Sequence, residues 1–349
     1  MDLLIFLLAL SILVLVHEFG HFICAKKSGV KVEEFGLGLP PRIIGKKIGG
    51  TIFSLNWLPI GGFCKLYGED EEGKGKDAFN NINPWQKLLV VMGGVLMNLI
   101  LAIIIFSIVY FILGVPKETK MVKVLDVTAE SPAAVVGLKS GDWIKEVGGV
   151  VINQSDELIT ETEKFKGGKA KLLVNRQGAD SVIEIEVREK PPEGQGAMGV
   201  SISNVEMVKV KWYESYKGIG YGFKEAYYWG KIIGGGVGNM IGGLFMGKTP
   251  KDVSGPIGMY EATSAIKRNQ GILAVIHFFG VVSVNLAVVN ILPFPALDGG
   301  RIIFVIYEMI TKKKAKQSFE ATVNNIGMWI LLSLIFLITI GDVKRLFFK

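Results

Sequence analysis

Two histidines and a glutamate lie close together in the first apolar segment of the chain, at His17, Glu18 and His21. On an α-helix, residues four apart share a face, so both imidazoles can point at one metal ion. Glu18 is then close enough to hold and deprotonate a water at that metal. The alternative is a helix-packing role without a metal, but the chain has only 3 histidines in 349 residues, which makes a chance match of this kind rare. The spacing predicts a metal site that activates water.

The pattern H-E-x-x-H is typical of zinc peptidases, in which two histidines bind the metal and the glutamate is the base. Here it lies within the apolar segment 3–25, which is long enough to cross a bilayer. Polar side chains in a membrane segment are costly, on the order of 3 kcal/mol each, so they mark functional sites. The position of the pattern predicts water-using chemistry at membrane depth.

The composition indicates an integral membrane protein, because 50% of the residues are hydrophobic and 20% are charged. Four segments are predicted to span the membrane: 3–25, 88–115, 272–292 and 326–340. The last is short and needs flanking residues to reach the interface. The net charge of +7 is interpreted as a signal of membrane orientation. No nucleic-acid partner is expected, since no motif that mixes aromatic and basic residues for that purpose is present.

Basic residues predict the orientation of the spans. They gather after the first span and again between the third and fourth, at Lys26, Lys27, Lys31, Arg42, Lys46, Lys47 and Lys65, and at Lys312, Lys313, Lys314 and Lys316. The positive-inside rule places both connections in the cytoplasm and the segment 116–271 outside. The C-terminal basic residues argue mildly against this orientation. His17 lies about 24 Å along the first helix, so the metal site is expected near the cytoplasmic side.

A third metal ligand should lie at a similar depth on another segment, and Asp298 is the candidate. It follows the third span, which runs from outside to inside. Pro293 and Pro295 break the helix just before it, and the backbone groups they free are tolerated only beside protein or a wet cavity. Three protein ligands leave an open position for water, as catalytic zinc requires.

With H-E-F-G-H in the first span and N-x-x-P-x-P-x-L-D-G after the third, the chain resembles the site-2 protease family of intramembrane zinc metalloproteases. It is most similar to the bacterial regulator-of-sigma-E protease branch. The resemblance covers nearly the whole chain and includes three further motifs, Leu58-Pro-Ile-Gly-Gly-Phe63, Gly94-Val-Leu-Met-Asn98 and Ser254-Gly-Pro-Ile-Gly258. Some members of the family have two PDZ domains, whereas this chain has room for one.

The resemblance implies a polytopic α-helical membrane protein of about four spans, with a re-entrant β-hairpin and an inserted extracytoplasmic PDZ-like α+β domain. It implies Zn²⁺ as the cofactor, held by His17, His21 and Asp298, with Glu18 as the catalytic base and Asn290 positioning the substrate backbone. The expected location is the bacterial inner membrane. The expected substrates are single-span membrane proteins that another protease has already trimmed, such as an anti-sigma factor or a leftover signal peptide.

Residues 43–66 are predicted to form short strands, at 43–44, 51–55 and 60–66, with a turn at Gly49-Gly50. Gly61 and Gly62 suit a tight loop or a close backbone approach, and we expect them to help position substrate. A free strand edge would hold a substrate extended by β-addition, which gives this hairpin a catalytic purpose. The alternative is an ordinary cytoplasmic hairpin packed on the helices.

The segment 119–190 contains S-P-A-A-x-x-G-L-x-x-G-D-x-I and resembles a PDZ domain. Such domains bind peptide ends or strands along a sheet edge, so it is expected to screen substrates. The alternative is a passive extracytoplasmic plug. The expected organisation is a membrane region at 1–118, the PDZ-like domain at 119–190, a linker with an amphipathic interfacial segment at 191–271 and a second membrane region at 272–349.

Two polar residues in the spans admit two interpretations each. Asn98 either bonds across helices or faces the substrate, and the family motif favours the latter. His277 is either a structural residue or a participant in the site. Aromatic and lysine residues at 212–247 fit a helix in the membrane interface, and the glycines at 234–243 are expected to weaken a long helix there, so that the segment bends or moves. Cys24 and Cys64 lack the spacing of a metal site and are interpreted as small buried hydrophobes.

Two other classes of protein fit the sequence less well than a protease does. A zinc transporter would need several ionisable residues along a path, and His277 is the only histidine in the later spans. A membrane scaffold that presents the PDZ-like domain would leave Glu18 and Asp298 without a purpose. Both alternatives account for fewer of the polar residues than a metalloprotease does.

Overall fold

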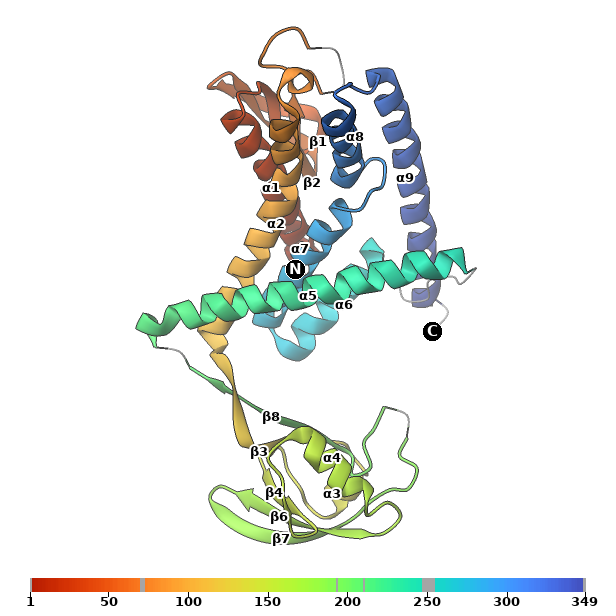
Figure 1. Cartoon of the computed structure of the whole chain (residues 1–349). Helices are drawn as coiled ribbons and strands as arrows, with labels where there is room; N and C mark the ends of the chain where they lie inside the picture. Colours follow the sequence, from red (N-terminus) through yellow and green to blue (C-terminus); the bar gives the residue numbers. More distant parts are fainter. Residues whose placement is uncertain (1, 70–72, 193, 210, 247–254, 348–349) are drawn as a thin grey trace. The chain divides into compact units, whose positions relative to one another are not determined.

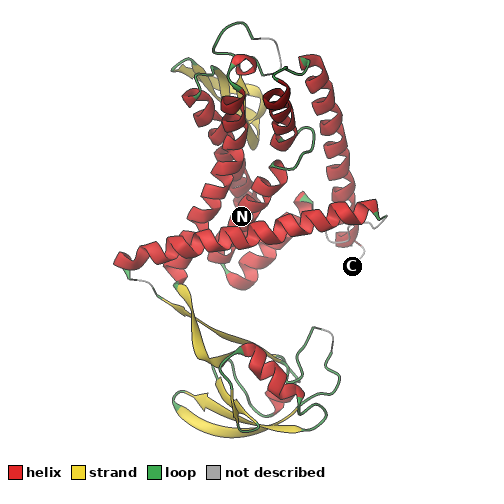
Figure 2. Ribbon diagram, viewed as in Figure 1, coloured by secondary structure: helices red, strands yellow, loops and turns green. Residues whose placement is uncertain are grey.

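The computed structural model describes residues 2–69, 73–192, 194–209, 211–246 and 255–347. The chain forms two compact units, the first made of Met1–Tyr110 and Ser215–Lys349 and the second of Phe111–Glu214. Figures 1 and 2 show that the first is mainly helical and the second mainly strands.

Four described helices of the first unit are long and apolar enough to cross a membrane. They are α1 (Asp2–Lys27), α2 (Pro84–Leu113), α7 (Ile272–Asn290) and α9 (Gln317–Phe347). This confirms the four apolar spans predicted from the sequence. The fourth segment, predicted as 326–340, lies in a candidate span of 28 residues, Gln317–Lys344, and this length exceeds the roughly 20 residues that a span requires.

Helices α1 and α2 contact each other through two glycines. A Cβ atom added to Gly20 would lie 2.1 Å from the carbonyl oxygen of Gly93, and one added to Gly93 would lie 2.6 Å from that of Gly20. Glycine is therefore required at both positions, because no side chain fits between the two backbones. This close approach brings the histidine-bearing turns of α1 directly against α2.

A long hairpin of β1 (Val32–Ile48) and β2 (Thr51–Leu66) connects α1 to α2. Its residue pairs show that it folds on itself, since Phe35 pairs with Cys64 on one side and with Phe53 on the other. The segments therefore lie in the order 42–48, 51–56, 32–37 and 62–66. Both expected strands of β2 are present, but β1 begins at Val32, before the predicted 43–44. Residues 32–37 were missed because their glycines and acidic residues obscure the alternation typical of a strand.

The remaining helices of the first unit are α5 (Ser215–Phe245), α6 (Pro256–Gln270) and α8 (Asp298–Thr311). Figure 1 shows α5 running across the direction of α2 and α9. The glycines expected to weaken this segment do not end the helix, because α5 continues through them to Phe245. Each glycine costs a helix only about 1 kcal/mol. Gly255 precedes α6 as its N-cap, whereas Ser254 of the same motif lies outside the described residues.

Helix α5 packs against other helices of the first unit through small residues. A Cβ atom at Gly222 would lie 2.3 Å from Ser107 Oγ on α2, so glycine permits close contact there. Ala226 is buried in a cluster with Phe106 of α2 and Val284 of α7. Helix α5 is therefore an integral part of the first unit.

The second unit is a six-stranded sheet in the order β7-β6-β4-β3-β8, with β5 paired to β4. The strands are β3 (Val115–Val127), β4 (Trp143–Val147), β5 (Val150–Val151), β6 (Lys169–Arg176), β7 (Ala179–Glu186) and β8 (Val200–Val208). The short helices α3 (Pro132–Val135) and α4 (Ser155–Glu163) complete it. Strand β8 pairs with β3 and lies outside the segment 119–190 that the sequence singled out.

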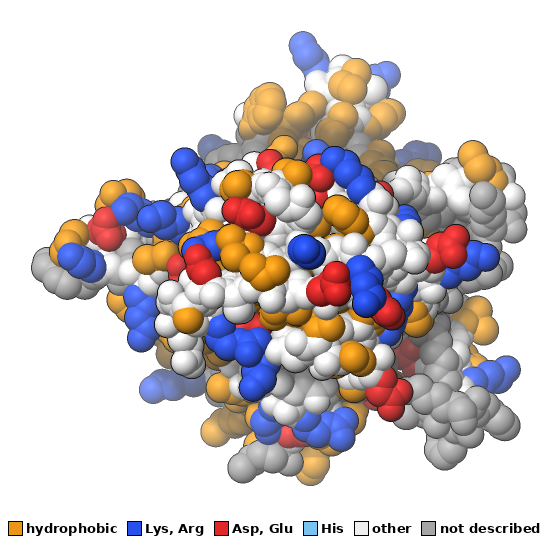
Figure 3. Space-filling view, turned by 90° about the horizontal axis from the view of Figure 1, so that it is seen from below, with side chains coloured by type: hydrophobic (Ala, Val, Ile, Leu, Met, Phe, Trp, Pro, Cys, Tyr) orange, Lys and Arg blue, Asp and Glu red, His pale blue; other side chains and the backbone are white. Residues whose placement is uncertain are grey.

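The core of the second unit is apolar and its surface carries mixed charge. Fully buried residues from several strands form one cluster, including Val122, Ile144, Leu172 and Ile185. Figure 3 shows Lys and Arg side chains interspersed with Asp and Glu on the face seen from below. The arrangement is that of a water-exposed domain with its own core.

Candidate active site

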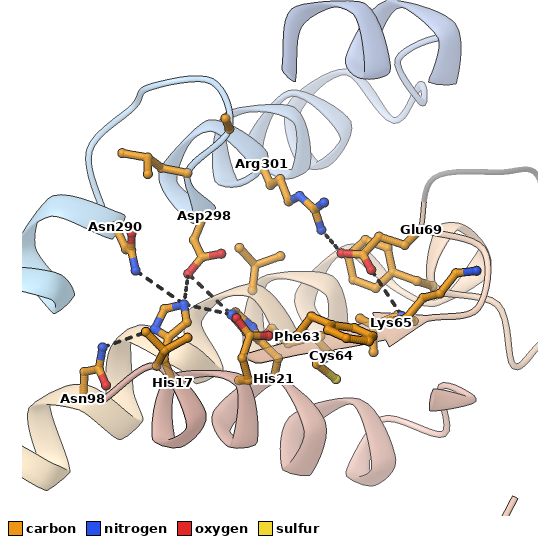
Figure 4. Close-up of a pocket in the computed structure, with 18 of the residues that line it drawn as sticks. His17, His21, Phe63, Cys64, Lys65, Glu69, Asn98, Asn290, Asp298 and Arg301 are labelled. Atoms are coloured by element: carbon orange, nitrogen blue, oxygen red, sulfur yellow. Dashed lines mark hydrogen bonds and ion pairs between the residues drawn. The ribbon is translucent and has the colours of Figure 1, made fainter. Parts of the chain in front are cut away.

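Two imidazole nitrogens and one carboxylate oxygen converge between α1 and α8 (Figure 4). His17 Nε2 lies 3.2 Å from His21 Nε2 and 3.1 Å from Asp298 Oδ2. His21 Nε2 lies 3.5 Å from the same oxygen of Asp298. The ligating atoms of the three residues all lie within 4.8 Å of one another. Three residues singled out in the sequence, nearly 300 positions apart, are thus brought together.

The chain folds sharply between α7 and α8 to place Asp298. Helix α7 ends at Asn290, and Asp298 is the first residue of α8. A Cβ atom at Gly299 would lie 2.0 Å from the carbonyl oxygen of Leu292, so only glycine lets the chain return so close to its own backbone. Helix α8 was not foreseen, but the turn forced by the prolines was.

The donor atoms of this group fit a zinc ion. The Nδ1 atom of His21 contacts the carbonyl oxygen of Val90 at 2.9 Å, and this contact places the imidazole proton on Nδ1. The Nε2 lone pair is therefore free to bind a cation. Asp298 Oδ2 is buried and has no hydrogen-bond partner, an arrangement that is costly unless a cation neutralises it. Two imidazoles and a carboxylate form a typical three-ligand zinc site.

Space for the imidazoles comes from Gly94 on α2. A Cβ atom there would lie 2.5 Å from His17 Cε1 and 2.5 Å from His21 Nε2. One turn later on the same helix, the completely buried Asn98 places its amide nitrogen 3.3 Å from His17 Nδ1. The spacing of four between Gly94 and Asn98 puts both opposite His17. The motif that contains them thus shapes the metal site.

The two asparagines predicted to position substrate both contact His17. Because the amide oxygen of Asn98 is buried without a partner, reversing its amide would let that oxygen accept the Nδ1 proton of His17. Ser283 of α7 also donates to the backbone carbonyl oxygen of Asn98 at 2.8 Å. The amide nitrogen of Asn290 lies 3.4 Å from His17 Nε2. Asn98 therefore bonds across helices, while Asn290 faces the metal-binding edge of the imidazole.

Glu18 shares one cavity with the three proposed ligands. The cavity has a volume of about 510 Å³ and is bounded by α1, α2, α7, α8 and the end of β2. The backbone N–H of Cys64 faces the Glu18 carboxylate across it. Burial and then the Glu18 carboxylate raise the pKa of the Cys64 thiol to about 12, so this thiol is neutral at pH 7.

Gly61 and Gly62 lie in β2 beside α1, outside the set of residues that line the cavity. Gly61 has a φ of +81°, which other residues rarely adopt. A Cβ atom at Gly62 would lie 3.2 Å from Leu15 of α1. A Cβ atom at Gly62 would also lie 2.9 Å from the carbonyl oxygen of Gly36, so this glycine lets β2 run close to β1 as well as to α1. A direct role of either glycine with substrate stays a prediction.

His277 does not line the catalytic cavity. Its Nε2 atom lies 2.7 Å from Glu225 Oε1 on α5, and its ring is 5.1 Å from that of Phe106. Of the two interpretations offered by the sequence, the contacts agree with the structural one.

Two residues that line the cavity, Glu69 and Arg301, were not predicted from the sequence. Arg301 lies one helical turn beyond Asp298, and this spacing was the sequence signal that could have identified it.

A bundle of apolar helices enclosing a His-His-Asp group, with a glutamate next to the first histidine, defines a metalloprotease-type site in a membrane protein. The chain belongs to peptidase family M50, whose sequence model matches residues 5–334. The predicted membership of the site-2 protease family is thereby confirmed, and the cofactor of this family is zinc.

Relatives align with the chain over nearly its whole length. A Clostridium acetobutylicum protein is 33% identical over 342 residues, covering 98% of this chain and 97% of the relative. One from Clostridium perfringens is 35% identical over 344 residues, or 97% of each chain. One from Campylobacter jejuni is 32% identical over 356 residues, covering 97% of this chain and 92% of the relative. All three carry the name "putative zinc metalloprotease".

Among solved structures, a match was found to the crystal structure of the PDZ domain of an SdrC-like protein from Listeria monocytogenes. It is 26% identical, with a TM-score of 0.22, and covers 24% of this chain and 87% of that domain.

Proposed function

We propose that this protein is an intramembrane zinc metalloprotease that hydrolyses peptide bonds in or near the transmembrane segment of single-span membrane proteins. The observation that carries the proposal is the group formed by His17, His21 and Asp298, with Glu18 in the same cavity, on helices that include a candidate span. A scaffold or an ion path would not need a base beside three metal ligands.

Zinc bound by the three ligands would lower the pKa of a water molecule toward about 7 and polarise the scissile carbonyl. Glu18 would accept a proton from that water and deliver it to the leaving amine. Val90 and Asn98 hold the two imidazoles from behind, which keeps their Nε2 atoms aimed at the metal position. Asn290, near His17 Nε2, is placed to donate its amide N–H to a substrate carbonyl.

The substrate would be held as an added strand on the segment 62–66 of β2. Among the described residues, this segment pairs with β1 on one side and with no strand on the other. Phe63, Cys64, Lys65 and Leu66 all line the catalytic cavity. A transmembrane helix must unwind before hydrolysis, because its carbonyls are hydrogen-bonded, and an open strand edge stabilises the extended form.

The second unit would select substrates. Strand β8 is at an end of its sheet, and α4 lies beside it, with Ser155 Oγ 3.3 Å from Asn204 Oδ1. A peptide end could add to this edge as an extra strand, as PDZ domains do. Resemblance to the family suggests pre-trimmed anti-sigma factors or signal-peptide remnants as substrates, the bacterial inner membrane as the location, an extracytoplasmic second unit and an active site near the cytoplasmic side.

The test is to incubate the purified full-length protein in detergent with a truncated single-span protein and to identify the products by mass spectrometry. Cleavage within or beside the apolar segment, abolished by a zinc chelator and restored by zinc, is expected. Cleavage confined to water-exposed parts of the substrate would contradict the intramembrane assignment. Replacing residues 115–208 by a short linker should change which substrates are cut while leaving the catalytic cavity intact.

A further inference from the structure

The open edge of β2 has alternate backbone N–H groups that point into the catalytic cavity. Tyr67, the residue after β2, donates its N–H to the carbonyl of Lys31, the residue before β1, at 2.9 Å, so this N–H points to the side on which β1 lies. Successive residues of a strand direct their backbone groups to opposite sides. Leu66 and Cys64 therefore direct their N–H groups away from β1, toward the edge where a substrate strand would add.

Both of these N–H groups already face carboxylates. The N–H of Cys64 faces Glu18, the proposed catalytic base. Leu66 N donates to Glu69 Oε2 at 3.2 Å. Glu69 is placed by the turn just after β2, and its side chain is only 14% exposed. A carboxylate oxygen thus occupies the place at Leu66 that a substrate carbonyl would take in an added strand.

Arg301 keeps Glu69 in this position. Its guanidinium forms an ion pair with Glu69 Oε1 (Figure 4). One oxygen of the carboxylate therefore binds Arg301, and the other accepts the N–H of Leu66. Arg301 lies on α8, one turn after Asp298, and it lines the same cavity as Glu69 and Leu66. The carboxylate therefore bridges the helix that carries a metal ligand and the strand that would carry the substrate.

We propose that Glu69, held by Arg301, caps the substrate-binding edge at Leu66 and competes with the substrate backbone for it. The proposal rests on the proposed protease function and on strand addition at β2. One N–H group cannot serve both acceptors fully, so a substrate strand that extends to Leu66 must displace Glu69. A segment that stays helical offers no free carbonyl for this exchange, whereas a locally unwound segment does. The cap therefore favours unwound substrates.

The test is the affinity for a fluorescently labelled single-span peptide, measured in the full-length Glu18→Gln background so that no cleavage occurs. Glu69→Ala is expected to lower the dissociation constant about tenfold, since the competing acceptor is gone. Glu69→Gln keeps an acceptor but loses the ion pair with Arg301, so a smaller decrease is expected; this variant also serves if Glu69→Ala does not fold. Zinc content reports the integrity of each preparation.

Glu33→Ala is the matched control. Glu33 also pairs with a basic residue of the hairpin, Lys65, at 3.3 Å, but does not occupy the N–H group of Leu66. Its dissociation constant should equal that of the parent. Unchanged or weaker binding by both Glu69 variants, or no binding by any of them, would overturn the cap. Failure of the protease function would instead appear as absence of cleavage by the protein that retains Glu18, whatever the binding result.

Discussion

Replacing Gly94 by alanine should damage the metal site without touching a ligand. The added methyl group would lie 2.5 Å from an atom of each imidazole, about 1 Å inside the usual contact distance for carbon. Helix α2 cannot move away easily, because Gly20 and Gly93 already hold its backbone against α1. The two imidazoles must therefore shift by a large part of that overlap.

A shift of this size exceeds the roughly 0.2 Å tolerance of zinc–ligand distances. Disturbing the groups that orient ligands typically lowers metal affinity by about 10- to 100-fold. We expect this loss for Gly94→Ala, which corresponds to about 1.4 to 2.8 kcal/mol of binding free energy. Competition with a chelating dye on the purified protein measures it, and cleavage should fall when zinc is limiting.

Gly235→Ala is the matched control, because a Cβ atom at this helical glycine meets no atom within 4 Å. Its zinc affinity should equal that of the wild-type protein. If Gly94→Ala bound zinc as tightly as the control, the imidazoles would not converge on one metal in the way described, and the reasoning would be refuted.

Two further predictions concern ion pairs. Lys87 of α2, which is buried, and Glu308 of α8, which is half-buried, form a pair at 2.6 Å, so Lys87→Met should lower the free energy of unfolding by about 3 kcal/mol, and adding Glu308→Leu should restore most of it. Denaturant unfolding in detergent that shows no loss for the single variant would contradict this. In the second unit, hydrogen bonding from Arg176 lowers the pKa of Asp142 below its ordinary 3.8. The pair of Arg176 and Asp142 therefore stabilises the second unit fully above pH 3.8, and this stabilisation is lost as the pH falls through the lower pKa that Asp142 has in the folded protein. Arg176→Met should accelerate amide hydrogen exchange in β4 and β6 at pH 7, and the difference in exchange rate between this variant and the wild type should shrink below about pH 4. An equal difference in exchange rate at both pH values would show that the pair of Arg176 and Asp142 does not stabilise the unit.

The sequence was sufficient for features that depend on short-range spacing. The pairing of His17 with His21 follows from helical geometry, and the turn before Asp298 follows from two prolines. The spans were predictable because apolar runs of this length are rare outside membrane-spanning helices. Family resemblance added the roles assigned to these residues and the motif around Asn98, whose contact with His17 became clear only from the structure.

Other features depend on partners distant in the sequence. Strand β8 pairs with β3 across about eighty residues, and no local pattern specifies that pairing. The middle position of residues 32–37 in the hairpin likewise depends on strands that lie on both sides of it. The contact of Glu69 with Leu66 and Arg301 is visible only once the hairpin and α8 are placed together. Local periodicity carries no information on such contacts.

The most direct test of the central claim is to measure bound zinc and cleavage together in the wild-type protein and in Glu18→Gln. Glu18 is a proposed base and not a ligand, so the account predicts about one zinc per chain in both proteins and cleavage of a truncated single-span substrate by the wild type alone. Cleavage by Glu18→Gln at the wild-type rate, or absence of zinc from both proteins, would contradict it.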